Sequence, residues 1–331
     1  MTLSTAFQTK QNTRVIIGTE ATMGTAALAT ADSIEMPVTD YSFDEIHKHS
    51  LSVAPPRTGS GAFTQSDDMV KWQRHDRMYD ISITFHATAQ SINRVCKALF
   101  GDGDGTNTLI GSMPSVTDFR DGQSNSVPVS IIFENAAHAG SGNDAVFTSC
   151  VCTGLTLSGD IASNGGVVMC TATFQTGYNM STSTATVSGT ETTLSSQTTM
   201  FNMHDLTVET LNEQDLLLYS FELSIQRPVN RIGFDNGSNF KPHGYALGGY
   251  EVTGSLTCKR DSESLEAIDA DMATPQALAL SAGDVFQIDA PKCIIDTSSI
   301  SFDDDGWKQT IPFMCTYSGA TSSTIVSIKT A

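Results

Sequence analysis

Apolar and polar residues alternate with a period of two along many short stretches of the chain. Within Met78–Ala87, apolar side chains stand at Ile81, Ile83 and Phe85 with polar residues between them. A second stretch, from Tyr219 to Ile225, places its apolar side chains at every other position. A period of two is the spacing of side chains on a half-buried β-strand. The pattern therefore predicts strands at both places.

Shorter segments and turn dipeptides extend this prediction to most of the chain. Asn164-Gly165 is a favoured turn between two apolar runs that end at Gly177, and Gly306 closes a similar Asp-rich turn. Asn-Gly and Asp-Gly are strong hairpin signals. Further strands are predicted at Thr13–Gly18, Asp40–Asp44, Val127–Phe133, Tyr250–Leu256 and Ala277–Leu280.

Two segments have helical spacing instead. Ser91–Leu99 places four apolar residues on one face, with Ser91 as the expected N-cap and Gly101 just past the end. Ser262–Met272 places three apolar residues on one face and acidic residues on another, with Asp261 or Ser262 as the expected N-cap. Two short helices are therefore predicted among the strands.

The order of predicted elements occurs twice. Each copy has a strand, a Pro- and Gly-containing loop, a second strand, a helix, a third strand and a closing hairpin. The best alignment places Tyr41-Ser42-Phe43 on Tyr219-Ser220-Phe221. A period of about half the chain indicates two copies of one domain rather than a solenoid of short repeats.

The expected fold class is mainly β, with two similar antiparallel β-sandwich or barrel domains and one short flanking α-helix in each. A chain of 331 residues is long enough for two cores. The expected division is an N-terminal arm at 1–35, a first domain at 36–180, a Ser/Thr-rich linker at 181–199 and a second domain at 200–331.

Composition excludes several classes of protein. The chain has 18 basic and 36 acidic residues and a net charge of −18. Binding to nucleic acid or to an anionic membrane depends on clusters of Lys and Arg, and here only Lys259-Arg260 are adjacent. No apolar run reaches the ~18 residues of a membrane span, and Met1–Val15 lacks the apolar region of a secretory signal. Seven cysteines without a C-x-x-C pair indicate reduced, mostly buried thiols.

No motif for catalysis or for metal binding is found. The segment Gly101–Asn107 is similar to a calcium loop, but Met113 stands where an EF-hand needs a carboxylate. Asp303–Asp305 fits a solvated turn, and His47 and His49 have no partners at zinc-site spacing. There is no G-x-S-x-G, P-loop or H-E-x-x-H motif. We therefore expect no enzyme activity, no cofactor and no metal.

The second repeat carries the clearest family signal. The strand Tyr219–Ile225, then Pro242, Tyr245 and Gly249, lead into the strand Tyr250–Thr257, which contains Val-Thr-Gly-Ser-Leu-Thr. This order of motifs resembles the tail tube (major tail) proteins of long-tailed bacteriophages. The first repeat has a weaker version, and its segment 147–177 is similar to the closing hairpin of that family.

The resemblance implies a structural virion protein. Such proteins form stacked rings whose inner sheets join into a continuous β-barrel around a DNA channel. Two domains per chain imply trimeric rings with pseudo-sixfold symmetry, although a ring of six whole chains is an alternative. The implied partners are other copies of the chain, the tape measure, tail terminator and distal tail proteins, and DNA in passage, with no membrane. Assembly in the bacterial host cytoplasm, a place in the virion tail and a non-contractile tail are expected by the same analogy.

An acidic channel would suit this function. Like-charged walls repel DNA phosphates, and three chains would carry three times the charge of −18. Only charges within a Debye length of ~8 Å affect the DNA. The lumen-facing candidates are Asp44, Glu45, Glu222 and Glu251, and the alternative is that they are ordinary solvated strand positions.

Two long loops are candidates for contacts between rings. Lys48–Val70 and Arg227–Gly249 both exceed the ~12–15 residues beyond which a loop is usually functional or disordered. Both combine Arg with aromatic residues, the types that contribute most to interfaces. The named candidates are Arg57, Phe63, Arg227, Arg231, Phe234, Phe240 and Tyr245. The alternative is a pair of plain surface loops.

A second class of protein has the same fold class. A two-domain β-sandwich adhesin or receptor-binding module would also be rich in Ser, Thr and strands. A secreted adhesin would normally have a signal sequence and paired cysteines, and neither is found in this sequence. The sequence therefore favours the tail tube over the adhesin.

Overall fold

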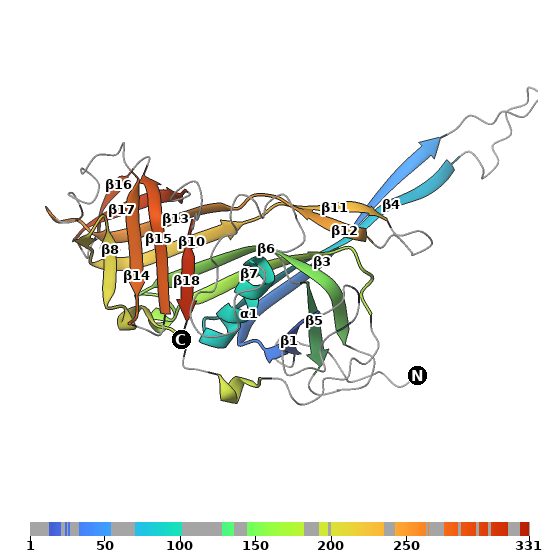
Figure 1. The fold of residues 1–331 in the computed structure, drawn as a ribbon, viewed down its shortest axis with the longest axis horizontal. Helices are drawn as coiled ribbons and strands as arrows, with labels where there is room; N and C mark the ends of the chain where they lie inside the picture. The colour runs from blue at the N-terminus through green and yellow to red at the C-terminus, as the bar shows by residue number, and fades with distance from the viewer. Residues whose placement is uncertain are drawn as a thin grey trace, which may run out of the picture.

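One large antiparallel β-sheet runs through both halves of the chain (Figure 1). The structure is a computed structural model. It describes residues 13–20, 24, 26, 33–53, 70–100, 128–135, 144–181, 192–197, 200–234, 242–262, 264, 275–283, 286–295, 298–303, 306–316 and 325–330. The predicted antiparallel, mainly β fold is confirmed.

The first half contains seven strands and one α-helix among its described residues. The strands are β1 Thr13–Thr19, β2 Ile34–Glu35, β3 Val38–Val53, β4 Val70–His86, β5 Val129–Asn135, β6 Ala145–Asp160 and β7 Met169–Thr176. Helix α1 spans Ala89–Phe100, and short 3₁₀ turns are η4 Asn164–Gly166 and η5 Leu194–Ser196.

The second half is made of shorter strands. They are β8 Val208–Leu211, β9 Gln214–Asp215, β10 Leu218–Gln226, β11 Val229–Phe234, β12 Pro242–Leu247, β13 Glu251–Lys259, β14 Gln276–Ser281, β15 Phe286–Ile295, β16 Ser299–Asp303, β17 Gly306–Cys315 and β18 Ser327–Thr330. A 3₁₀ turn, η6 Met203–Asp205, precedes them. Strands β11 and β12 form a separate two-stranded sheet.

The strand order of the first half of the main sheet recurs in the second half. The path of the sheet is β2-β1-β5-β6-β10-β13-β17-β15-β14-β8-β9. The first half has the additional run β3-β4-β7-β6, and the second has the matching run β10-β13-β17-β16. The two runs meet where β6 pairs with β10, so the halves share one sheet rather than forming two separate sheets.

The duplication extends to individual residues. Two of the register shifts in the first half recur in the second: one at the start of β3 and of β10, and one where β5 pairs with β6 and β14 pairs with β15. These irregularities lie at Val38/Asp40 and Val129/Ile131 in the first half and at Leu218/Ser220 and Gln276/Leu278 in the second. A β-bulge is a specific feature of a fold, so its recurrence shows that the halves are built on one plan.

The register corrects the sequence alignment by two residues. Val38 faces Phe85 just before the first bulge, as Leu218 faces Cys258 before its equivalent. By this register, Tyr41 is equivalent to Phe221 rather than to Tyr219. A shift of two residues keeps every side chain on its face, and the alternation therefore did not reveal the error.

A related correction concerns the alternation in β10. Leu218 is buried and Tyr219 is only half-buried, because the bulge between Leu218 and Ser220 changes the face on which the side chains lie. From Phe221 onward, alternate residues are buried as predicted.

The predicted helix Ser91–Leu99 is confirmed as α1, with a different N-cap. The backbone N–H of Ser91 donates to Thr88 Oγ1 (3.1 Å), and the N–H of Thr88 donates to Ser91 Oγ (2.9 Å). Thr88 is therefore the cap and Ser91 completes a reciprocal pair of the capping-box type. Asp261 and Ser264 make the same pair of hydrogen bonds in the second half. The rest of the predicted second helix, like most of the linker 181–199, lies outside the described residues.

The segment expected to be an N-terminal arm contains integral strands. β1 pairs along its length with β5, and Val15, Ile16 and Ile17 are buried. β2 continues this ladder. The apolar triplet in β1 has a buried position inside the sheet, so residues 13–19 and 34–35 belong to the first half.

The apolar faces of both halves form one continuous core. It includes α1, which lies over β6, and all seven cysteines are buried free thiols, as expected. Both segments expected to be long loops contain strand residues where the structure describes them. β3 and β4 pair as far as Val53 and Val70 and project from the body, while β11 and β12 form the corresponding hairpin of the second half (Figure 1).

Candidate functional site

The sheet run β3-β4-β7-β6-β10-β13-β17-β16 has one face against the core, and no described element covers its other face. We call this other face the polar face. Along β10, Phe221, Leu223 and Ile225 point into the core, and therefore Glu222 and Ser224 lie on the polar face. The same alternation holds along β7, where Cys170, Ala172 and Phe174 are buried.

Short hydroxyl side chains dominate the polar face. Thr84 and Thr171 hydrogen-bond through their hydroxyls across β4 and β7 (3.0 Å), and Thr257 and Thr310 do so at the equivalent position of the second half (3.3 Å). Such pairs satisfy the hydroxyls within the sheet. The surface between the carboxylates is therefore made of short, uncharged side chains.

Carboxylates outnumber ammonium groups on this face. Among the residues whose side chains the structure describes, alternation places the acidic residues Asp40, Asp44, Asp80, Asp160, Glu222 and Glu251 and the basic residues Lys259 and Lys308 on this face. The Lys308 ammonium lies 4.7 Å from the centre of the Tyr219 ring. The face as a whole is therefore acidic.

The structure divides the four lumen-facing candidates between the two faces. Asp44, Glu222 and Glu251 lie on the polar face and are exposed. Glu45 lies on the opposite face of β3, where it accepts a hydrogen bond from the buried Tyr79 hydroxyl (2.9 Å). Glu45 follows Asp44 directly in the chain, so the two cannot share a face of one regular strand.

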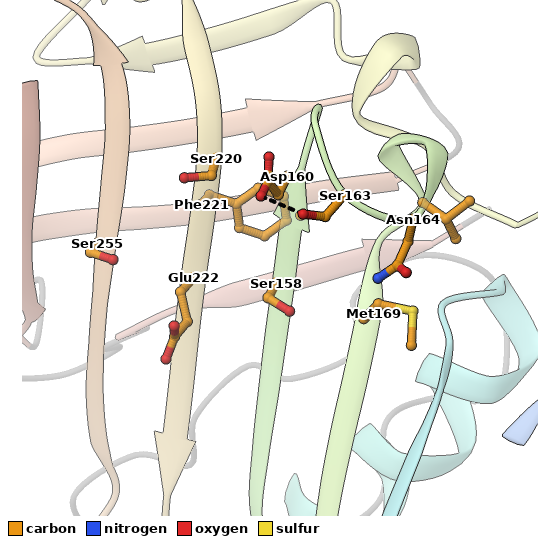
Figure 2. Close-up of a pocket in the computed structure, with 11 residues that line it drawn as sticks. Ser158, Asp160, Ser163, Asn164, Met169, Ser220, Phe221, Glu222 and Ser255 are labelled. Atoms are coloured by element: carbon orange, nitrogen blue, oxygen red, sulfur yellow. Dashed lines mark hydrogen bonds between the residues drawn. The ribbon is translucent and has the colours of Figure 1, made fainter. Parts of the chain in front are cut away.

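Two shallow depressions lie on the polar face. One, of about 240 Å³, lies over β6, β10 and β13, with Ser158, Glu222 and Ser255 on three adjacent strands (Figure 2). At its edge, the Ser163 hydroxyl donates to Asp160 Oδ2 (2.8 Å). The other, of about 200 Å³, is lined by Ser42, Asp44, Asp80, Ser82, Thr153, Thr173 and Gln175 among others.

The linings of these depressions offer hydroxyls and carboxylates rather than an activated nucleophile. Across the part of the chain that the structure describes, there is no cluster of three or more His, Cys, Asp or Glu residues that could hold a metal ion. The calcium-like segment 101–107 lies outside the described residues, as do the side chains of His47 and His49.

Arg227, a candidate for contacts between rings, is buried inside the chain. One of its terminal nitrogens donates to the Leu99 carbonyl oxygen (2.9 Å) and to the Tyr250 hydroxyl (2.9 Å), and that hydroxyl donates to Leu99 as well (2.8 Å). Burial lowers the pKa of the guanidinium, an effect that Tyr250 partly offsets. Arg227 thereby joins the end of α1 in the first half to β10 and β13 in the second.

Tyr245 also makes a contact between the halves. It lies on β12, and its buried hydroxyl accepts a hydrogen bond from the backbone N–H of Gly177 at the end of β7 (3.0 Å). Burial raises the pKa of Tyr245 to about 12. Arg231 is half-buried opposite Tyr245. Arg57, Phe63 and Phe240 lie outside the described residues, as does the side chain of Phe234.

The sequence analysis did not identify an apolar edge on β16. Ile300, Phe302 and Trp307 are large, exposed apolar residues on β16 and the adjoining end of β17, and the Phe302 and Trp307 rings lie 5.2 Å apart. Clusters of this kind usually mark interaction surfaces. The alternation Ile300–Phe302 in the sequence predicts a strand, but only the structure shows that β16 is at the edge of the sheet.

The fold and the site define a class: a protein with one large antiparallel β-sheet, a strand order that recurs in its two halves and, within the described residues, strand edges without a neighbour. The chain matches the phage tail tube protein family over residues 10–315, and it therefore belongs to that family. Its members are structural components of the virion tail and are not enzymes. A comparison with curated protein sequences gives no match.

Proposed function

We propose that this protein polymerises as stacked rings of three chains into a phage tail tube, with its polar face lining the DNA channel. The residue-by-residue duplication of the sheet carries this proposal. Each chain supplies two equivalent four-stranded runs, so three chains supply six and give a ring of pseudo-sixfold symmetry.

The circumference of the sheet supports three chains. Eight strands per chain at roughly 4.8 Å spacing give a barrel of about 37 Å across the backbone for three chains, before strand tilt widens it. Two chains would give about 24 Å on the same basis, and side chains on the inside would narrow it further. Strand tilt widens both barrels and inward side chains narrow both, so the three-chain barrel leaves the larger clearance for a DNA duplex.

The chemistry of the polar face supports its placement at the channel wall. Its carboxylates, including Asp44, Glu222 and Glu251, repel phosphates, and its hydroxyls are engaged with one another. We leave Glu45 out of this proposal, since it lies on the other face. The β11–β12 hairpin and the tip of the β3–β4 hairpin remain the candidates for contacts between rings. Assembly in the bacterial host and contacts with the tape measure, terminator and distal tail proteins belong to the same proposal.

The test is the mass of the purified protein in solution together with negative-stain microscopy. Hollow tubes, or rings with the mass of three chains and six lobes, are the expected result. Rings of six chains would keep the tube and contradict the three-chain ring. A monomer that stays monomeric at high concentration would contradict the tube and favour the adhesin-like alternative.

A further inference from the structure

The contact between the two halves of the chain is a complete, buried strand pair. β6 and β10 pair antiparallel from Gly154/Gln226 to Asp160/Ser220. On the core face, Leu157 lies opposite Leu223, and both are buried. We call this strand pair the internal seam. In the internal seam, the last strand of one four-stranded run (β6) pairs with the first strand of the other (β10).

The same two edges recur at the ends of the sheet without a neighbouring strand. Within the described residues, β3 pairs only with β4 and β16 only with β17. Their core faces are correspondingly open: Phe43 is 38% exposed, Ile300 is 47% exposed and Phe302 is 70% exposed. An open, apolar strand edge is an aggregation hazard unless another strand covers it.

Comparing the pairing registers of β3 and β16 with that of the internal seam identifies the strand that would pair with each open edge. Through its pairing with β17, Ile300 is equivalent to Leu157 of the internal seam, and Phe302 is equivalent to Gly159. The bulge near Val38 in β3 matches the bulge near Leu218 in β10. Counting from these two bulges, Phe43 is equivalent to Leu223. Phe43 and Ile300, which are exposed at the two ends, are therefore the equivalents of Leu223 and Leu157, which bury each other in the internal seam.

We propose that β16 of one copy pairs antiparallel with β3 of the next copy, in the register of the internal seam. This inference rests on the proposed ring. It places Phe302 opposite Tyr41 of the next copy, Ile300 opposite Phe43, and Ser301 opposite Ser42 on the polar face. Each core-face pair joins two apolar or aromatic side chains, the kind of cross-strand pair that stabilises sheets.

This strand pairing also gives the projecting β3–β4 hairpin a contact site on the neighbouring copy. Within the chain, Tyr245 of the β11–β12 hairpin contacts Gly177 just after β7. By register, Trp72 of the β3–β4 hairpin holds the position of Tyr245, and Thr316 just after β17 holds that of Gly177. The β3–β4 hairpin of the next copy therefore lies against the region of Thr316.

Disulfide cross-linking tests the register. The chain with Ser42→Cys and Ser301→Cys carries thiols that lie on opposite edges of its own sheet, separated by β4, β7, β6, β10, β13 and β17. Under mild oxidation, directly opposed residues of two copies are close enough to link. Dimers and trimers on a denaturing, non-reducing gel are the expected result, with no species above the trimer if the ring has three chains.

The matched control uses the same strands and the same face in the wrong register. Asp40→Cys with Ser299→Cys is offset by four residues, roughly 13 Å along the strand, and is expected not to link. Cross-linking of the control but not of the test chain would overturn the proposed register. If microscopy shows tubes while Ser42 and Ser301 do not link, the seam is wrong and the tube stands. If no assembly forms at all, the proposed function itself has failed.

A second variant tests the surface without cysteines. Phe302→Asp changes an exposed residue, so the monomer is expected to keep its fold by circular dichroism and to lose ring formation by at least about tenfold. Leu194→Asp, an exposed apolar residue on η5 away from both edges, is the control and is expected to assemble normally. Normal rings from Phe302→Asp would overturn the proposal.

Discussion

At the scale of single residues, burial controls the chemistry of the thiols. All seven cysteines are buried and free. Burial raises the pKa of Cys152 to about 12 and that of Cys258 to about 11. Cys293 and Cys315 face each other with their sulfurs 3.6 Å apart, and their contact raises the pKa of Cys293. The reactive thiolate is therefore scarce at neutral pH.

We therefore predict that the native protein reacts very slowly with a thiol reagent at pH 8 and reacts fully once it is unfolded. The measurement is a colorimetric thiol count with and without denaturant. A fast-reacting native thiol would contradict the burial of that side chain. The same property makes introduced cysteines the only reactive ones in the cross-linking experiment.

Glu209 gives a pH-dependent prediction. Burial raises its pKa, although the backbone N–H of Leu218 donates to its carboxylate (2.9 Å) and partly offsets the shift. Because the pKa is raised in the folded state, the charged carboxylate destabilises the fold at any pH above that folded-state pKa. This destabilisation is absent at a pH below the unfolded-state pKa of about 4.3. Glu209→Gln should therefore melt slightly higher than the wild type at pH 7, and the difference should shrink toward pH 4. A difference that grows on acidification would contradict this account.

At the scale of elements, the sequence predicted many of the strands, α1 and the order of the repeat, because alternation and capping are local signals. It did not predict β2, β8 or β9, and it placed β11 and β12 in a loop. It could not predict the register, since a two-residue error in aligning Tyr41 preserves the face of every side chain. The prediction also named Asp44 and Glu45 together, although alternation along one strand places neighbouring residues on opposite faces. The burial of Arg227 was also missed, because its partners Leu99 and Tyr250 are distant in sequence.

The link through Arg227 is testable by itself. Arg227→Met removes the hydrogen bonds to Leu99 and Tyr250 and should lower the free energy of unfolding by about 1–3 kcal/mol. The measurement is denaturant unfolding, with the exposed neighbour Gln226→Met as a control expected to change less than about 0.5 kcal/mol. Equal stability of the two variants would show that Arg227 does not join the halves.

At the scale of the whole molecule, the duplicated sheet and its acidic polar face make a prediction about DNA. Tubes of the Glu222→Lys, Glu251→Lys variant should retain DNA fragments at low salt, and wild-type tubes should not, because phosphate binding follows positive charge. Co-sedimentation of tubes with DNA measures this. The control variant, Glu213→Lys with Asp215→Lys, makes the same charge change in the β8–β9 hairpin, away from the polar face. Equal DNA retention by both variants would contradict a lumen lined by the polar face.

Cryo-electron microscopy of the assembled protein tests the central claim most directly. The account predicts a hollow tube with three chains per ring, a continuous inner sheet and the side chains of Glu222 and Glu251 facing the channel. A ring with the polar face on its outside, or with the edges of β3 and β16 unpaired between copies, would contradict it.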